Sequence, residues 1–257
     1  TLPRWNGRTL AHATFDARLH DRIVFCSDGI TQSGLGTRRF PFGWGSEQLE
    51  RHVCRELVAD PDLASGDLAQ RLVQCALQHD SGIAGDDITC CVLHSRETRV
   101  LQVLTGPPFE RARDAEYARQ VLNPGTRSVL CGGTTAEIVG RELGRPLVMS
   151  LEHLDPAIPA TSEMEGAALV SEGCITLSAV ADMLERGEAP ARANGATRLR
   201  ELFLHSDCIV FLVGSGVNPA HHDPSLPVEL EIRRTLVRRL KTLLESKHFK
   251  QVDVRYF

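Results

Sequence analysis

The sequence predicts an α/β protein in two parts: an α+β part with antiparallel strands, followed by a mostly parallel, three-layer α/β domain. Up to about residue 97, two apolar strands flank a region of amphipathic helices. From residue 98, short apolar strands alternate with amphipathic helices, a pattern typical of parallel sheets that are covered on both faces. The charged run at residues 95–99 is the predicted boundary, which gives domains of residues 1–97 and 98–257.

Composition limits the possible functions. The 257 residues carry a net charge of -4, and 42% are hydrophobic, as in ordinary globular proteins. Nucleic-acid-binding proteins normally show a basic excess, so we expect no nucleic-acid partner. No apolar run is long enough for a membrane span. The eight cysteines include no Cys-x-x-Cys pair, and we expect mostly buried, free thiols in a cytoplasmic protein.

The elements of the first part follow from apolar periodicity and helix-end signals. We expect an edge strand around residues 9–15, a strand at 23–26, a glycine-rich loop at 34–45, helices from Ser46 to Asp60 and from Ser65 to His79, and a last strand at 88–93. His79 lies at the end of its helix, where an imidazole is expected to complement the helix dipole.

The second part contains the alternating pattern. We expect strands at residues 100–104, 128–131, 147–151, 168–171, 208–213 and 252–256, and helices at residues 110–122, 136–143, 177–185, 196–204 and 227–246. Each helix has apolar residues at the three- and four-residue spacing of one buried face. A Rossmann-like layering without a dinucleotide fingerprint is therefore predicted.

Two acidic turns carry the strongest functional signal. Asp28-Gly29 follows the first apolar strand, and Gly85-Asp86-Asp87 precedes the last one. Asp-Gly and Gly-Asp are also ordinary turn sequences, so either motif alone is compatible with a purely structural role. Together, with amphipathic helices between them, they favour a site for Mg²⁺ or Mn²⁺, which prefer carboxylate oxygens.

These two motifs also carry a resemblance to a known family. Through Ser27-Asp28-Gly29-Ile30-Thr31 and Asp86-Asp87-Ile88-Thr89, residues 3–95 resemble the C-terminal half of a PPM-type (type-2C) serine/threonine phosphatase domain, of the bacterial branch typified by stage II sporulation protein E. The resemblance implies that Asp28 and Asp86 are catalytic metal ligands, with Gly29 and Asp87 beside them. It also implies two Mn²⁺ or Mg²⁺ ions per complete site and a phosphorylated regulatory protein as substrate.

One part of the family pattern is absent from the sequence. The phosphatases carry an earlier Asp-Gly motif whose carboxylate bridges the two metals, but Asp28-Gly29 is the only Asp-Gly dipeptide here. With Thr1 at the start and 27 residues before Asp28, the chain is expected to be a fragment of a longer phosphatase. A half-built site should bind metal weakly, so we expect the parent protein, and not this chain alone, to hydrolyse phosphoesters.

Glycine turns follow three strands of the second part. They are Gly132-Gly133-Thr134-Thr135, Glu172-Gly173 and Gly214-Ser215-Gly216. Ligands of parallel sheets bind beyond the carboxyl ends of the strands, and helix N-termini attract anions, so these turns could together hold a small anionic ligand. They lack the lysine of a P-loop, and a plain strand–helix turn is an equally open interpretation. The following His221, His222 and Asp223 favour a solvent-facing loop over a metal site.

Two other functions remain open at this stage. The chain could act as a ligand-sensing or partner-binding regulatory module through residues 98–257, with the first part serving as a scaffold. It could also be a small-molecule enzyme that uses the glycine turns to hold a nucleotide or a phosphate.

Overall fold

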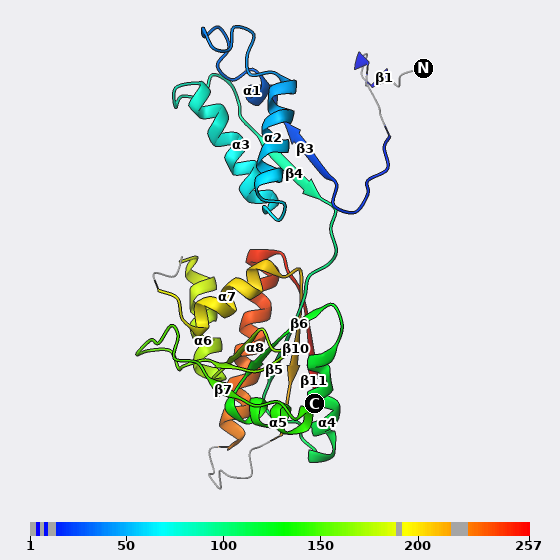
Figure 1. Ribbon diagram of the computed structural model, residues 1–257, viewed down its shortest axis with the longest axis vertical. Helices are drawn as coiled ribbons and strands as arrows, with labels where there is room; N and C mark the ends of the chain where they lie inside the picture. Colours follow the sequence, from blue (N-terminus) through cyan, green and yellow to red (C-terminus); the bar gives the residue numbers. More distant parts are fainter. Residues whose placement is uncertain (1–3, 6–7, 10–13, 189–191, 217–225) are drawn as a thin grey trace. The chain divides into compact units, whose positions relative to one another are not determined.

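The structure is a computed structural model that describes residues 4–5, 8–9, 14–188, 192–216 and 226–257. It divides into two compact units, Thr1–Glu97 (unit 1) and Thr98–Phe257 (unit 2), whose elements are drawn in Figure 1. Unit 1 holds a two-stranded antiparallel sheet, and unit 2 holds a seven-stranded, mostly parallel sheet. The α/β class predicted from the sequence is confirmed.

Unit 1 is built on one strand pair with helices between the strands in sequence. Its elements are β3 (Arg22–Cys26), α1 (Asp28–Thr31), α2 (Ser46–Ala59), α3 (Ser65–His79) and β4 (Cys90–His94). The antiparallel register pairs Cys26 with Cys90, so the end of β3 lies beside the start of β4. A separate short pair joins β1 (Arg4–Trp5) to β2 (Arg8–Thr9). The strand predicted at residues 9–15 is wrong for Thr14 and Phe15, which have no strand structure, and residues 10–13 lie outside the described part.

The helices of unit 1 cover one face of the β3–β4 sheet. Leu68, Leu72 and Ala76 recur every four residues along α3 and are fully buried, because this spacing places them on one side of a helix. Phe25 of β3 and Leu93 of β4 are each 52% exposed. Alternate side chains of a strand point to opposite faces, so the second face of this small sheet is open.

The prediction that most cysteines are buried is wrong. Of the eight, only Cys131 is buried, whereas Cys26, Cys54 and Cys91 are exposed. Cys91 lies in β4 two residues before Leu93 and therefore shares its open face. An apolar run in the sequence indicates a strand here, but the single helical layer of unit 1 leaves half of that strand uncovered.

The sheet of unit 2 has the strand order β11-β10-β5-β6-β9-β8-β7. The parallel strands are β5 (Val100–Thr105), β6 (Thr126–Cys131), β9 (Leu169–Ser171), β10 (Cys208–Val213) and β11 (Gln251–Tyr256), and the antiparallel edge is β7 (Val148–Met149) and β8 (Ser162–Glu163). From β5 the chain continues to the adjacent β6, crosses to the far edge at β7, returns through β8 to β9 beside β6, and then crosses to the other side of β5. The strand order therefore reverses between β5 and β10, the point at which open parallel sheets bind ligands.

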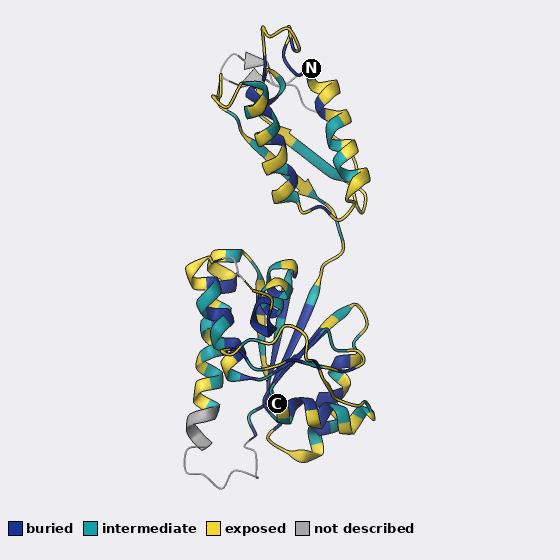
Figure 2. Cartoon of the chain, turned by 60° about the vertical axis from the view of Figure 1, so that its left-hand side comes forward, coloured by how far each residue is buried: buried dark blue, intermediate teal, exposed yellow. Residues whose placement is uncertain are grey.

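Helices cover both faces of this sheet. They are α4 (Asp114–Arg119) with the short 3-10 turns η1 (Arg111–Arg113) and η2 (Gln120–Leu122), α5 (Gly133–Leu143), α6 (Cys174–Arg186), α7 (Gly195–His205) and α8 (Leu226–His248). On β10, Phe211 packs into the core cluster shared with α6, α7 and α8, and Leu212 packs into the cluster shared with α4 and α5. Figure 2 shows the buried central strands with helices on either side. None of the helices in the described ranges combines the length and the apolar character needed to cross a membrane.

Phe211→Ala tests the core of unit 2. Phe211 is fully buried, and its ring centroid lies 5.8 Å from that of Phe203. The substitution should lower the free energy of unfolding of unit 2 by about 3–5 kcal/mol, because it removes packing contacts and leaves a cavity. Chemical denaturation followed by circular dichroism measures the change. Phe109→Ala is the control, because Phe109 is 74% exposed; equal losses in both variants would contradict the burial of Phe211.

Candidate functional site

One side chain, that of Ser27, joins the two acidic turns of unit 1. The Ser27 N–H donates to the Thr89 carbonyl at 3.0 Å, and the Ser27 hydroxyl donates to the Asp87 carbonyl at 2.6 Å. The Thr89 N–H donates back to Ser27 Oγ at 2.9 Å. These bonds tie the end of β3 to the segment before β4, across 60 residues between Ser27 and Asp87.

Gly29 permits a close approach between the same two turns. A Cβ atom at this position would lie 2.5 Å from the Asp87 carbonyl oxygen and 3.1 Å from its carbonyl carbon. Both are backbone atoms, which cannot swing away as the tip of a side chain can. Glycine is therefore required here by the space available, and the sequence Asp28-Gly29 has a structural reason in this fold.

The joined turns place exposed carboxylates in the same region of unit 1. Asp28 begins α1, and its Oδ2 accepts a hydrogen bond from Gln32 Nε2 at 3.2 Å. Asp86 Oδ1 accepts one from the Asp87 N–H at 2.7 Å. All three aspartates are exposed, and an ionised carboxylate has about four acceptor positions, so each retains capacity for a ligand.

Carboxylate oxygens are the kind of ligand that Mg²⁺ and Mn²⁺ prefer, but these three aspartates do not make a complete metal-binding site. Within the described ranges, no group of three or more His, Cys, Asp or Glu side chains is arranged to hold a metal ion. Asp28, Asp86 and Asp87 therefore supply at most part of a two-metal ligand shell. No catalytic step is assigned to a metal on these residues alone.

Unit 1 also contains a cavity of about 600 Å³, the basic pocket, between the loop after α1 and one side of α2 and α3. Arg39 lines it from the loop, and Arg51 and Arg55 line it from successive turns of α2. Glu47 is the one carboxylate among its described lining residues. Three guanidinium groups against one carboxylate leave an excess of two positive charges in the pocket.

Rings form the wall of the basic pocket. The His79 ring centroid lies 4.4 Å from that of Phe40 and 4.9 Å from that of Trp44, and the His52 centroid lies 5.4 Å from that of Trp44. Burial lowers the pKa of His79, with Arg39 acting in the same direction. Burial also lowers the pKa of His52. Both imidazoles are therefore neutral near pH 7, and the positive charge of the pocket comes from its arginines.

The predicted role of His79 as a charge that complements the dipole of α3 is wrong. Its ring is neutral and packed among aromatic side chains, and its Nδ1 lies 3.1 Å from the Ser33 hydroxyl. The neighbouring Asp80 Oδ1 accepts the Gly34 N–H at 2.6 Å. These contacts fasten the glycine-rich loop to the end of α3, so that its basic and aromatic residues have a fixed support.

The thiol of the basic pocket is unsuited to nucleophilic chemistry. Cys75 Sγ lies 3.7 Å from His79 Nε2, which resembles a nucleophile beside a base. Burial, however, raises the pKa of Cys75, and a reactive cysteine needs a lowered pKa because the thiolate is the nucleophile. The pocket is therefore better suited to binding than to covalent catalysis.

At the carboxyl edge of the unit 2 sheet, only two of the three predicted glycine turns meet. The Gly132 N–H donates to the Ser171 carbonyl at 2.8 Å, and a Cβ at Gly173 would lie 3.5 Å from Gly132 Cα. The turn Gly214-Ser215-Gly216 follows β10, which β5 separates from β6. It packs on residues 106–108, where the Gly216 N–H donates to the Pro107 carbonyl at 3.0 Å. The three turns therefore do not all follow neighbouring strands, which is the condition under which they would line one pocket.

The glycine turns that do meet differ in their capacity for an anion. Glu172 Oε2 accepts the Ile175 N–H at 3.0 Å, so this carboxylate already occupies the start of α6 as a cap. The N-cap residue of α5 is Gly132, which has no side chain to cap the helix, and among the described residues the buried Thr135 hydroxyl has no hydrogen-bond partner. Of the residues predicted to bind an anion, Gly132, Gly133, Thr134 and Thr135 therefore have the more suitable surroundings.

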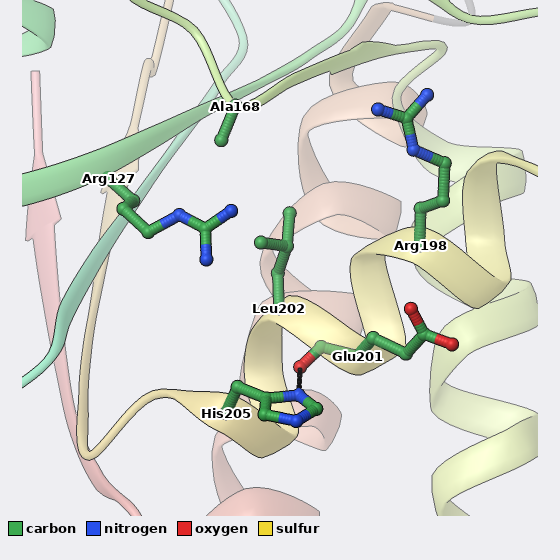
Figure 3. A pocket seen from close by; sticks show the side chains of 6 residues that line it. All are labelled: Arg127, Ala168, Arg198, Glu201, Leu202 and His205. Atoms are coloured by element: carbon green, nitrogen blue, oxygen red, sulfur yellow. Dashed lines mark hydrogen bonds between the residues drawn. The ribbon is translucent and has the colours of Figure 1, made fainter. Parts of the chain in front are cut away.

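A cavity of about 230 Å³ in unit 2 lies at the opposite, amino edge of the sheet (Figure 3). Arg127 reaches into it from the start of β6 toward α7, which contributes Arg198, Leu202 and His205. None of the residues predicted to bind a ligand lines this cavity. The prediction for His221, His222 and Asp223 falls outside the described residues.

Comparison of the chain with family models, curated proteins and solved structures found no match. The resemblance to PPM-type phosphatases therefore remains a prediction that rests on the two acidic motifs. What the structure adds is the contact between those motifs and a separate basic pocket in the same unit.

The basic pocket was not predicted from the sequence. The sequence feature that could have indicated it is a four-residue spacing, which places residues on one side of a helix. This spacing relates Glu47, Arg51 and Arg55 on α2, and Cys75 and His79 on α3. Such spacing is also typical of solvent-exposed helix faces. Only the packing of the loop against both helices turns two polar faces into a cavity.

Gly29→Ala tests the contact between the acidic turns. The added Cβ should displace the Asp87 backbone and lower the free energy of unfolding of unit 1 by about 1–3 kcal/mol. The chain has two tryptophans, so denaturation in a Trp5→Phe background can be followed through the fluorescence of Trp44. The control is Gly66→Ala, where a Cβ meets nothing within 4 Å and the helix should gain up to about 1 kcal/mol. Equal stability of the two variants would refute the close approach.

Proposed function

We propose that unit 1 is the C-terminal part of a metal-dependent protein serine/threonine phosphatase domain. Asp28 and Asp86 are its metal-binding carboxylates, with Asp87 as an additional donor. The observation that carries this proposal is the hydrogen bonding of Ser27, which joins two acidic motifs 60 residues apart. By resemblance, the substrate is a phosphorylated regulatory protein.

In this proposal the backbone of unit 1 positions the metal-binding groups before any metal arrives. Ser27 fixes the distance between the turns, and Gly29 leaves room for the Asp87 carbonyl. The exposed carboxylates of Asp28 and Asp86 then project from turns that are held together. Bound Mg²⁺ or Mn²⁺ would supply an activated water and neutralise phosphoryl oxygens.

The complete site needs one more carboxylate than these residues offer. The family pattern places it on another Asp-Gly motif, and the 257 residues contain only Asp28-Gly29. We therefore assign the hydrolysis to a protein that also contains such a motif. The 257-residue chain by itself is assigned no phosphatase activity.

A regulatory, ligand-binding role for unit 2 is the second candidate function. Two observations favour it: the Thr135 hydroxyl in the first turn of α5, which is buried without a hydrogen-bond partner among the described residues, and the reversal of strand order between β5 and β10. A small anion is the ligand that such a helix N-terminus attracts. This role is compatible with a phosphatase in unit 1, since unit 2 would then sense a signal for it.

The test of the phosphatase proposal is phosphate release from a phosphoserine peptide during a Mn²⁺ titration. A protein that contains this chain together with the second Asp-Gly motif should be active, and Asp28→Ala and Asp86→Ala should each lower its kcat/KM at least about 100-fold, because each removes charge stabilisation from the reacting phosphoryl group. The 257-residue chain alone should release no phosphate.

Asp62→Ala is the matched control for these variants. Asp62 is an exposed aspartate of the same unit that lies in the loop between α2 and α3, away from the acidic turns in sequence. Its replacement should leave the Mn²⁺-dependent rate unchanged. Full activity in both Asp28→Ala and Asp86→Ala would overturn the assignment of the metal ligands.

A further inference from the structure

We propose that the basic pocket of unit 1 binds the dianion of a phosphate monoester. The pocket is a separate site from the acidic turns, and the proposal requires neither a metal nor phosphatase activity. Its volume of about 600 Å³ lies in the range of roughly 300–1,000 Å³ that is usual for small-ligand sites.

The charge of the pocket matches a dianion. Arg39, Arg51 and Arg55 face one carboxylate, that of Glu47, which leaves two positive charges to be neutralised. The chain as a whole has a net charge of -4, so this excess is local and does not follow from the composition. A concave site lined by one sign of charge concentrates ligands of the opposite sign.

The guanidinium groups are available to a ligand. Arg39 lies 5.1 Å above the Phe40 ring centroid, and Arg55 lies 2.9 Å from the neutral His52 imidazole. These contacts orient the two side chains without neutralising their charge. Arg51 meets Glu47 at 3.5 Å in an exposed pair, and such pairs contribute only about 0–1 kcal/mol, so a phosphate can replace this partner.

A second carboxylate close to the pocket, that of Glu56, has an arginine partner outside the pocket. Glu56 lies next to Arg55 in sequence, but it pairs with Arg71 at 2.6 Å, and this hydrogen bond lowers the pKa of Glu56. Burial raises the pKa of the Cys75 thiol, and the fields of Arg39 and Arg55 act in the opposite direction. The charge of Glu56 also raises the pKa of this thiol, with the smallest effect of these groups, so both arginines and Glu56 act at the pocket wall.

The chemistry of the walls favours a phosphate ester over a bare ion. Planar guanidinium groups bind phosphate oxygens in pairs, and the side-chain amides of Gln48 and Gln78 line the same cavity. Trp44 and Phe40 add ring surface that can contact the organic part of an ester. Hydrogen bonds from Ser33 and Gly34 to the end of α3 hold the loop in place, so the pocket exists before a ligand binds.

Trp44 fluorescence provides the experiment. In the metal-free 257-residue chain with Trp5→Phe, inorganic phosphate and a phosphoserine peptide should each give a saturable change in Trp44 emission at constant ionic strength. Arg39→Ala and Arg55→Ala should each weaken this binding about tenfold or more, because each removes a charge-assisted hydrogen-bond donor. Both arginines are exposed, so the variants should keep the fold, which circular dichroism verifies.

Arg38→Ala is the matched control. Arg38 is exposed and adjacent to Arg39 but does not line the pocket, so its removal should leave the affinity unchanged. Absence of a saturable response to both phosphate probes would overturn the proposal. Equal weakening by Arg38→Ala and Arg39→Ala would also overturn it, because the effect would then be general electrostatics.

The two probes also identify the source of the phosphate. Tighter binding of the phosphoserine peptide than of inorganic phosphate assigns the pocket to a phosphorylated protein, and equal binding assigns it to a small phosphate. A peptide with glutamate in place of phosphoserine should bind at least about tenfold more weakly; equal affinity would refute a phosphate site. This binding assay contains no metal, whereas the hydrolysis assay depends on Mn²⁺. The proposal of a phosphate site and the proposal of a phosphatase can therefore be refuted independently.

Discussion

The hydrogen bonds of Ser27 are the interaction on which the functional interpretation of unit 1 depends. A single hydroxyl accepts from the Thr89 N–H and donates to the Asp87 carbonyl, so the last turn of one strand and the approach to another are fixed at one point. Each such bond contributes a net of about 1 kcal/mol, which is small, but losing the hydroxyl would leave both backbone groups without their partner. Gly29 adds a steric condition, because any larger residue would separate the turns.

The same local framework supports the basic pocket. The Gly45 N–H donates to the Thr31 carbonyl at 2.8 Å, and the Trp44 N–H donates to the Ser33 carbonyl at 3.0 Å, so the loop begins and ends against α1. That helix starts at Asp28, so the first acidic turn and the loop that lines the pocket belong to one hydrogen-bonded stretch of backbone. A phosphorylated ligand bound by Arg39 would therefore contact the loop that follows the helix carrying a proposed metal ligand.

Sequence periodicity predicted the longer elements but not the shortest ones, and not the contacts between elements. The four-residue repeat of Leu68, Leu72 and Ala76 predicts α3, and the uninterrupted apolar run 208–213 predicts β10. The two-residue β8 carries no such pattern. Strand order is set by long-range packing, so the separation of Gly214 from Gly132 by β5 was not predictable. In the candidate site, residue types indicated the acidic turns, whereas the Ser27 bonds and the basic pocket arise only when distant segments pack.

The most direct measurement of the central claim is paramagnetic broadening by Mn²⁺ in the amide NMR spectrum of the 257-residue chain. If Ser27 and Gly29 hold the acidic turns together, a weakly bound Mn²⁺ should broaden the amides of residues 27–31 and 85–88 at the same metal concentration. The amide signals of the exposed Asp60 and Asp62 should broaden only at a higher Mn²⁺ concentration. The account would be contradicted if the amides of only one turn broadened. It would also be contradicted if both turns broadened only at the Mn²⁺ concentration that broadens Asp60 and Asp62.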